Sequence, residues 1–236
     1  MTSHLPTEYD AALEPVHVVL PMRTISGGKA RLGEALDAEE REELVLGLLL
    51  HTLAVLAEWR PCRHIHLVSP DPVLDAATRG AGVPVSVHRQ VGGGLNEGVR
   101  LGIEVALAAG AASLLVLPGD LPHLSTEALD ELITAADAGL AAAAGGPLVA
   151  IAPSDARSGT NALLLRPPDV IAPAFGNDSF EAHLRAAEAA DASVQVVSDA
   201  ALGFDLDTPE DLERLDPARL RELMAWGRAV AERVEA

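Results

Sequence analysis

Short apolar segments with β-strand preferences alternate with longer helical segments, and this alternation limits the possible folds more than any other feature of the chain. Strands are expected in the first part at 16–20, 65–68, 83–87 and 113–117. One of the helices between them begins at Asp37, where Glu40 three residues later completes a capping-box signature, and reaches about Trp59. A β-α-β-α series of this kind predicts a mostly parallel sheet covered by helices on both faces.

The second half of the chain is less regular but continues the same pattern. Strands are expected at 148–152, 161–165 and 194–197, and helices at 179–190 and 217–234. Thr208, followed by Pro209 and by an acid at the third helical position, predicts another helix start. No repeat is present. We therefore expect a disordered tail over 1–14 and one α/β domain over 15–236, with a Rossmann-like, mostly parallel twisted sheet flanked by helices.

Composition excludes several classes of partner. The formal net charge is −18, from 17 Lys+Arg and 35 Asp+Glu, which argues against nucleic acid or an anionic membrane as the main partner. No apolar run approaches the roughly 20 residues that span a bilayer, and the first residues lack the apolar core of a signal peptide. Cys62 is the only cysteine, so neither a disulfide framework nor a thiolate zinc site is possible. These features predict a cytoplasmic protein.

One segment contrasts with the overall acidity. Residues 15–33 contain no acidic residue, yet they include Arg23, Arg31 and Lys29, the only lysine of the chain. A glycine-containing loop after the first strand, with basic side chains beside it, suits a polyphosphate. The segment is not a Walker A loop, because Ala30 follows Lys29 where that motif has Ser or Thr. A solvated basic loop is the alternative interpretation.

A second glycine-rich segment follows the third expected strand. Gln90 and Asn96 flank three successive glycines, 92–94. Glycine lets the backbone approach a flat ligand closely, and the two amides can bond to a base edge. A mobile turn capped by Asn96 is the alternative.

Three aspartates are candidates for a metal site. Asp120 follows the apolar strand 113–117 and is expected at the carboxyl edge of the sheet, where open α/β sheets bind ligands. Asp205 and Asp207 point to the same side if their segment is extended. Carboxylates crowded on one face repel each other unless a cation lies between them, which favours Mg²⁺. Ordinary turn or pre-cap residues are the alternative.

Two polar segments could bind an anion. Ser158 to Asn161 precedes an apolar strand and contains Thr160, and the segment from Phe175 to Phe180 precedes an expected helix. Hydroxyls and unpaired N–H groups at a helix start suit a phosphate or carboxylate, although plain helix capping explains the second segment too. His64 and His66 have no accompanying carboxylate, so a structural role is favoured for them.

These motifs together resemble the phosphoenolpyruvate / 2-phospho-L-lactate guanylyltransferases of deazaflavin coenzyme F(420) biosynthesis. The resemblance runs from about residue 16 to 215. It rests on Leu20-Pro-Met-Arg, Lys29-Ala-Arg-Leu, Gly92-Gly-Gly-Leu-Asn, Leu117-Pro-Gly-Asp-Leu-Pro, Gly159-Thr-Asn-Ala-Leu-Leu-Leu-Arg-Pro-Pro, Phe175-Gly-x-x-Ser-Phe and Asp205-Leu-Asp-Thr-Pro-Glu-Asp-Leu. It implies a sheet like that of the nucleotide-diphospho-sugar transferases. The first loop departs from the family pattern, since Ser26-Gly27-Gly28 is richer in glycine.

The resemblance also implies a reaction and a role for each motif. GTP and a small phosphorylated C3 acid give a guanylylated diphosphate and pyrophosphate, and the product passes to a downstream deazaflavin transferase. By resemblance, the triphosphate is neutralised by Arg23, Lys29 and Arg31. The guanine nucleotide is held by Gln90, Gly93, Gly94 and Asn96. One or two Mg²⁺ ions are held by Asp120, Asp205 and Asp207. The acceptor, phosphoenolpyruvate in the family's bacterial members, is held by Thr160, Gly176 and Ser179.

Two other functions compete with this one. A molybdopterin guanylyl or cytidylyl transferase would share the fold, but the segment from Phe175 to Phe180 argues against it. A non-catalytic nucleotide-binding module would be expected to lack the metal carboxylates, and all three are here. The sequence leaves open the choice between phosphoenolpyruvate and 2-phospholactate, and the oligomeric state, for which a homodimer is one option.

Overall fold

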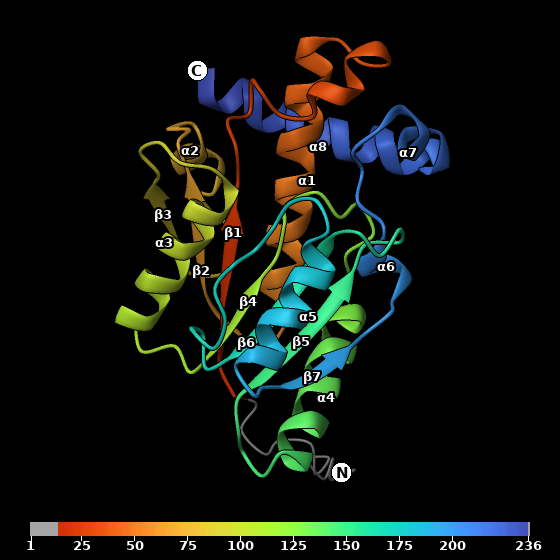
Figure 1. Cartoon of the computed structure of the whole chain (residues 1–236). Helices are drawn as coiled ribbons and strands as arrows, with labels where there is room; N and C mark the ends of the chain where they lie inside the picture. Colours follow the sequence, from red (N-terminus) through yellow and green to blue (C-terminus); the bar gives the residue numbers. More distant parts are fainter. Residues whose placement is uncertain (1–13, 236) are drawn as a thin grey trace, which may run out of the picture.

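The computed structural model describes residues 14–235, so the expected tail lies outside the described residues except for Glu14. Within this range one sheet of seven strands has the order β3-β2-β1-β4-β6-β5-β7 (Figure 1). The strands are β1 (Val16–Pro21), β2 (Cys62–Ser69), β3 (Val85–Arg89), β4 (Ser113–Val116), β5 (Leu148–Pro153), β6 (Thr160–Arg166) and β7 (Ser193–Val196). The helices are η1 (Ala30–Glu34), α1 (Ala38–Glu58), α2 (Leu74–Ala77), α3 (Leu95–Ala108), α4 (Thr126–Ala142), α5 (Ser179–Ala189), α6 (Ala200–Gly203), α7 (Pro209–Arg214) and α8 (Pro217–Glu235).

The prediction of a mostly parallel sheet is confirmed, with one reversed strand. β1 pairs in parallel with β2 and β4, β2 with β3, and β5 with β7. Among the described strands, only β6 is antiparallel to its neighbours, β4 and β5. Its first residues, Thr160 and Asn161, therefore lie at the edge of the sheet where β1 and β4 end.

Helices cover both faces of the sheet, which explains why its central strands are apolar on both sides. Val18 and Leu20 of β1 belong to the core shared with α1 and α4. Val19 faces the other way, into the core shared with α3 and α5. The N-terminus of α1 has the predicted capping box, since the N–H of Glu40 donates to Asp37 and the N–H of Asp37 donates to Glu40. The sequence did not predict η1 and α6.

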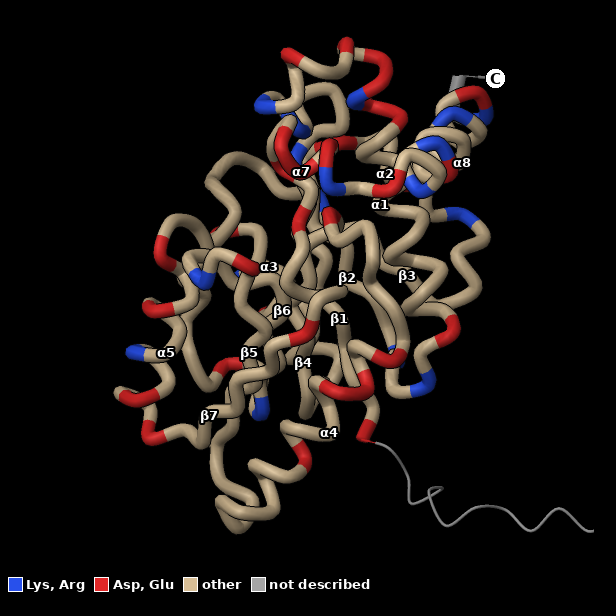
Figure 2. The backbone as a smooth tube through the Cα atoms, turned by 90° about the vertical axis from the view of Figure 1, so that its right-hand side faces the viewer, with Lys and Arg blue, Asp and Glu red and all other residues tan. Residues whose placement is uncertain are grey.

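Acidic residues are distributed over many helices and loops and do not form one patch (Figure 2). The net charge of −18 is therefore compatible with a locally basic segment such as 15–33. No helix among the described residues has the length and apolar character needed to cross a membrane.

Helices α1 and α8 approach closely through one glycine on each. A Cβ atom at Gly47 would lie 1.9 Å from the backbone oxygen of Leu223, and a Cβ atom at Gly227 would lie 1.7 Å from that of Glu43. The buried Glu43 carboxylate also accepts hydrogen bonds from Nε and Nη2 of Arg228, at 2.7 and 2.8 Å. The close contact between the two helices thus requires residues without side chains.

A cluster of histidines crosses three neighbouring strands. His17 Nδ1 lies 3.0 Å from His66 Nε2, and His66 Nδ1 lies 3.1 Å from His88 Nε2. The His64 ring packs 4.7 Å from that of His66, centroid to centroid. Burial and the charges of the other three rings lower the pKa of His66 to about 3. These contacts support the structural role that was favoured for His64 and His66.

We expect Gly47→Ala to destabilise the protein. Alanine normally stabilises a helix by about 0.5–1 kcal/mol relative to glycine, but here the added methyl group would collide with backbone, and overpacking costs about 1–3 kcal/mol or more. Urea unfolding should therefore show a lower free energy of unfolding. Gly33→Ala is the control, because its Cβ would meet nothing nearer than 3.5 Å. Equal stability of the two variants would contradict the close contact.

Stability should fall as the pH falls below about 6.5, because His66 stays neutral in the folded protein while its unfolded counterpart takes up a proton. The stabilisation is complete above pH 6.5 and is lost progressively towards pH 3. In melting experiments at pH 7.5 and 5.0, His66→Leu should show a smaller drop in Tm than the wild type. Ile65→Val changes a buried, non-titrating neighbour and should keep the wild-type drop. An unchanged drop in His66→Leu would exclude His66 as a main cause.

Candidate active site

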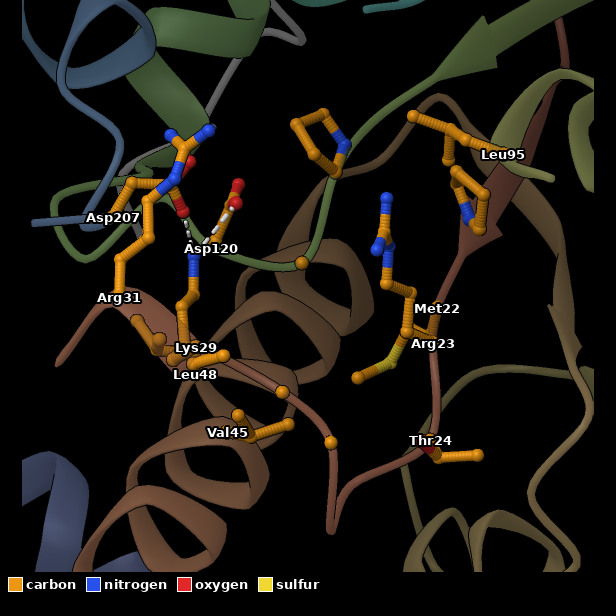
Figure 3. A pocket seen from close by; sticks show the side chains of 16 residues that line it. Met22, Arg23, Thr24, Lys29, Arg31, Val45, Leu48, Leu95, Asp120 and Asp207 are labelled. Atoms are coloured by element: carbon orange, nitrogen blue, oxygen red, sulfur yellow. Dashed lines mark hydrogen bonds and ion pairs between the residues drawn. The ribbon is translucent and has the colours of Figure 1, made fainter. Parts of the chain in front are cut away.

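A pocket of about 400 Å³ opens at the carboxyl edge of β1 and β4 (Figure 3). Residues of the loop 21–31 form most of its wall. Leu95, the turn 118–120 and Asp207 complete the wall above Val45 and Leu48 of α1. Open α/β sheets bind their ligands at this edge. The pocket is therefore the candidate active site.

The basic loop 21–31 is held in place from the end of β2. The backbone N–H of Ile25 donates to Asp71 Oδ2 at 2.8 Å, and that of Val73 donates to Asp71 Oδ1 at 3.0 Å. The Asp71 carboxylate thus holds both the turn 71–73 and the loop 21–31 in place. Gly28 packs against α1, where a Cβ atom would lie 2.8 Å from Val45 Cγ2, so this position requires glycine.

Lys29 lies between two carboxylates at the pocket. Its Nζ is 2.9 Å from Asp120 Oδ2 and 2.6 Å from Asp207 Oδ1, and its side chain is 10% exposed. Burial acts to lower the pKa of Lys29, but the two carboxylates outweigh it and raise the pKa. The ammonium group is therefore charged. From the sequence we expected Lys29 to neutralise a triphosphate; the structure pairs it with two of the expected metal ligands.

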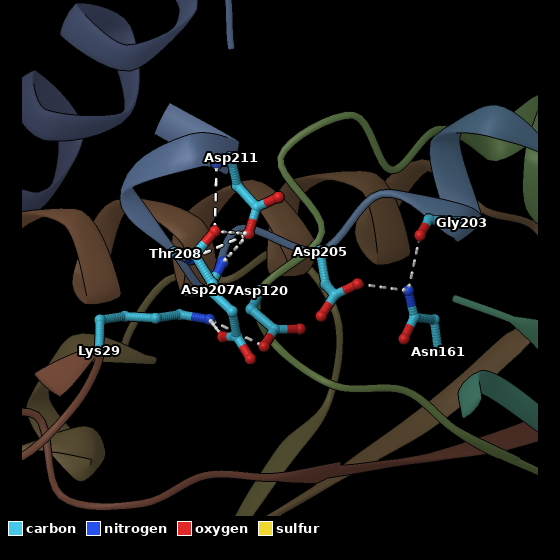
Figure 4. A network of polar contacts seen from close by, with 8 residues as sticks. All are labelled: Lys29, Asp120, Asn161, Gly203, Asp205, Asp207, Thr208 and Asp211. Atoms are coloured by element: carbon cyan, nitrogen blue, oxygen red, sulfur yellow. Dashed lines mark hydrogen bonds and ion pairs between the residues drawn. The ribbon is translucent and has the colours of Figure 1, made fainter. Parts of the chain in front are cut away.

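The third carboxylate, Asp205, lies between Asp120 and Asn161 (Figure 4). Asn161 Nδ2 donates to Asp205 Oδ1 at 3.2 Å and to the carbonyl of Gly203 at 3.1 Å. The buried Leu206 donates its N–H to the carbonyl of Asp120 at 3.2 Å, which ties this segment to the turn after β4. Burial, and then the charge of Asp120, raise the pKa of Asp205.

This network has one polar atom that suits a cation. Asp120 Oδ1 is buried and has no hydrogen-bond partner among the described residues. Carboxylate oxygens are the ligands that Mg²⁺ prefers. Residues 14–235 contain no ready-made group of three or more His, Cys, Asp or Glu side chains for a metal ion, and Lys29 takes one oxygen each from Asp120 and Asp207. The donor set fits Mg²⁺, and the metal site stays a prediction.

The two arginines expected at a triphosphate both line the pocket. Figure 3 shows Arg31 beside Lys29, extending towards Asp207, and Arg23 on the opposite side of the pocket. Both are exposed, and neither forms an ion pair within the part of the chain that the structure describes. Their positive charges can therefore face a polyanion in the pocket.

The glycine loop 90–95 is closed by its own hydrogen bonds. Gln90 Nε2 donates to the carbonyls of Gly92 and Gly94, at 2.9 and 3.0 Å. Gly92 and Gly93 have φ values of 74° and 77°, in the left-handed region that glycine adopts without strain. Of this loop, only Leu95 lines the pocket.

Asn96, expected at the guanine, pairs with a peptide group. Its Oδ1 accepts from the N–H of Phe175 at 2.7 Å, and its Nδ2 donates to the carbonyl of Phe175 at 2.9 Å. The amide oxygen and one N–H donor are therefore engaged. Asn96 joins the start of α3 to the segment 174–179.

The residues expected to hold the acceptor lie outside the lining of this pocket. Thr160 begins β6 and Ser179 begins α5, and the N–H of Ser179 donates to the carbonyl of Gly176 at 3.2 Å. His183 of α5 bonds to Thr160 and to the backbone of Ala174.

Three residues of the site were not predicted from the sequence. Asn161 lies within one of the quoted motifs and holds Asp205. Asp71 and His183 have no local signal, because their partners are 46 and 23 residues away in the chain.

The seven-stranded sheet with a pocket at its carboxyl edge defines a class of fold, that of the nucleotide-diphospho-sugar transferases. A protein described as a nucleotide-diphospho-sugar transferase, from Desulfovibrio desulfuricans, has the same fold, with a TM-score of 0.69 and 20% sequence identity over 92% of this chain and 98% of that one. The predicted fold class is thereby confirmed.

The model of the family described as "Guanylyl transferase CofC like" matches residues 16–216. The chain belongs to this family, and it is a guanylyltransferase. It is 41% identical to a phosphoenolpyruvate guanylyltransferase from Sphaerobacter thermophilus, over 84% of this chain and 90% of the relative. It is 43% identical to one from Rubrobacter xylanophilus, over 85% and 93%. It is 31% identical to a 3-phospho-D-glycerate guanylyltransferase from Colwellia psychrerythraea, over 84% and 90%.

We expect Asp71→Ala to weaken GTP binding by about tenfold, because the loop 21–31 loses the hydrogen bond that anchors Ile25, and one such bond is worth about 1–1.5 kcal/mol. The dissociation constant can be measured by calorimetry. Asp75→Ala is the matched control, since Asp75 is exposed on the neighbouring helix α2. Wild-type affinity in Asp71→Ala would show that the loop is held by its other contacts.

Proposed function

We propose that this chain transfers GMP from GTP to phosphoenolpyruvate, giving enolpyruvoyl-diphosphoguanosine and pyrophosphate. Membership of the guanylyltransferase family and the two phosphoenolpyruvate guanylyltransferase relatives support this acceptor. The observation that carries the proposal is the pairing of Lys29 with Asp120 and Asp207 beside a pocket lined by Arg23 and Arg31. Such a site can bring anions together.

The reaction needs placement and charge neutralisation more than proton transfer. A phosphate oxygen of the acceptor attacks the α-phosphorus of GTP, and the bond from that phosphorus to the bridging oxygen of pyrophosphate breaks. Because the attacking phosphate is already an anion, no general base is required. Arg23 and Arg31 would neutralise the triphosphate. Lys29, whose ammonium has a third N–H beyond its two carboxylate bonds, could add a contact to a phosphate oxygen.

Asp120, Asp205 and Asp207 would hold Mg²⁺, which when bound offsets the negative charge on the transferring phosphoryl group. Asn161 holds Asp205 in position. The unpartnered oxygen of Asp120 and the raised pKa of Asp205 support this role, since a cation beside them would stabilise both ionised carboxylates.

The remaining roles follow from the family resemblance. Gly93 and Gly94 would let the backbone approach the guanine base, and Gln90 braces that loop while its Oε1 stays available as an acceptor. Asn96 keeps one N–H for the base beyond its bonds to Phe175. Thr160, Gly176 and Ser179 would hold the acceptor. In coenzyme F(420) biosynthesis, the activated product would pass to a transferase that acts on a deazaflavin.

Pyrophosphate release tests the proposal. The protein is incubated with GTP and phosphoenolpyruvate, with Mg²⁺ or with EDTA. Release should occur with phosphoenolpyruvate and Mg²⁺, and should be abolished by EDTA. Parallel reactions with 2-phospho-L-lactate and with 3-phospho-D-glycerate, the acceptor named for the Colwellia relative, decide the acceptor. Faster turnover with either of these would replace phosphoenolpyruvate. No release with any of them would contradict the proposed reaction.

Asp205→Asn should lower kcat at least about 100-fold, because one carboxylate of the Mg²⁺ site is lost. The fold should survive, since asparagine keeps an oxygen for Asn161 and removes a charge that its neighbours repel. Tm is therefore expected to stay equal or to rise. Glu210→Gln, an exposed change at the start of α7, is the control and should keep full activity. A near wild-type rate in Asp205→Asn would remove Asp205 from the metal site.

A further inference from the structure

A fully buried histidine lies between the residues expected to hold the acceptor. His183 of α5 is 0% exposed. Its Nδ1 is 2.9 Å from Thr160 Oγ1, and its Nε2 accepts the backbone N–H of Ala174 at 3.0 Å. Its ring also meets the Phe175 ring edge-on, with centroids 4.8 Å apart. None of the roles described above uses this side chain.

The hydrogen bonds determine where the protons of this pair lie. A backbone N–H can only donate, so Nε2 of His183 must present a lone pair to Ala174. Burial lowers the pKa of His183 to about 4, so the ring is neutral near pH 7. Its one ring proton is therefore on Nδ1, which donates to Thr160 Oγ1. Thr160 accepts this bond, and its own hydroxyl proton is left to point elsewhere.

We propose that His183 is a positioning residue, which turns the hydroxyl proton of Thr160 towards the acceptor and holds the backbone of 174–175 beside it. The proposal rests on the proposed function, because it takes Thr160 as an acceptor-binding residue. An anionic acceptor needs donors, and a hydroxyl that accepts from the imidazole keeps its own proton to donate elsewhere. The imidazole thus keeps the Thr160 proton out of the bond between the two side chains and leaves it available for a phosphate or carboxylate oxygen.

The same backbone segment is also held by Asn96 of α3, a residue expected at the guanine nucleotide. Asn96 bonds to both the N–H and the carbonyl of Phe175, while His183 holds the adjacent Ala174. Beyond them the chain turns sharply, with Gly176 at φ 128° and Asp178 at φ 56°. The turn leads into Ser179, which is 1% exposed. Two anchors therefore set where this turn lies relative to Thr160.

Two substitutions separate the two bonds of His183. The amide of asparagine lies nearest the position of Nδ1, so His183→Asn can still donate to Thr160. The amide of glutamine reaches the position of Nε2, so His183→Gln keeps the bond to Ala174 and loses the donor to Thr160. We expect His183→Gln to raise KM for phosphoenolpyruvate about tenfold and His183→Asn to raise it less. KM for GTP should change by less than about twofold in both.

Thr160 supplies the matched test. Thr160→Val removes the hydroxyl and should raise KM for the acceptor about tenfold, whereas Thr160→Ser keeps the hydroxyl and should stay within about twofold of the wild type. The double variant Thr160→Val/His183→Gln should be no worse than Thr160→Val alone, since His183→Gln is expected to act only through the Thr160 hydroxyl. Multiplied effects of the two changes, or equal rises in both KM values, would overturn the proposal.

A measurement without substrate separates this inference from the proposed function. In NMR spectra of protein with ¹⁵N-labelled histidine, the signals of the His183 ring are identified because they are missing from the spectrum of His183→Gln. At pH 7 it should show a proton on Nδ1 and none on Nε2. A protonated Nε2 would overturn the role of His183 whatever the activity. If wild-type protein turns over no C3 phospho-acid while Nδ1 carries the proton, the proposed function fails and the acceptor-directed role of Thr160 fails with it.

Discussion

One buried ammonium group allows carboxylates from distant parts of the chain to share an edge of the sheet. Lys29 reaches Asp120 and Asp207, which are 91 and 178 residues away from it in the chain. Without this positive charge the carboxylates would repel one another at short range. The pKa of Asp205 is raised by burial first and then by the charge of Asp120. The basic loop, the turn after β4 and the segment 205–207 therefore depend on each other electrostatically.

The strand directions of the sheet bring these segments to one edge. β1 and β4 run side by side and deliver the basic loop and Asp120 to the same edge. β6 runs the other way, so that Thr160 and Asn161 reach this edge from the beginning of a strand. The chain thereby contributes to the site from both directions, without a helical crossover between β5 and β6. The segment 174–179 is then joined to α3 through Asn96.

Local patterns predicted most of the fold, because each central strand is buried on both faces and therefore reads as an apolar run. The capping box at Asp37 was predicted for a similar reason, since its partners are three residues apart. The direction of β6 was not predictable, because it depends on pairing with β4 and not on its own residues. The α6 turn is too short to have a periodic pattern, and Asp199 stabilises it by accepting two backbone hydrogen bonds.

The site residues also divide into those that a local pattern predicts and those whose position depends on tertiary contacts. Glycine, lysine and aspartate in characteristic segments could be recognised from the sequence, but their partners could not. Lys29 is bonded to carboxylates, and Asn96 is bonded to a peptide group 79 residues further on. Asp71 anchors the basic loop and His183 contacts Thr160, although neither belongs to a motif. Long-range pairing of this kind is a property of the tertiary structure.

The glycine contact between α1 and α8 has a consequence for the depth of the pocket. Val45 and Leu48, which form its floor, flank Gly47 on α1. α8 supplies none of the lining residues, yet its backbone lies against α1 at Gly47. A larger residue at Gly47 or Gly227 would therefore push the two helices apart and move the floor of the pocket, without altering any residue that a ligand would touch.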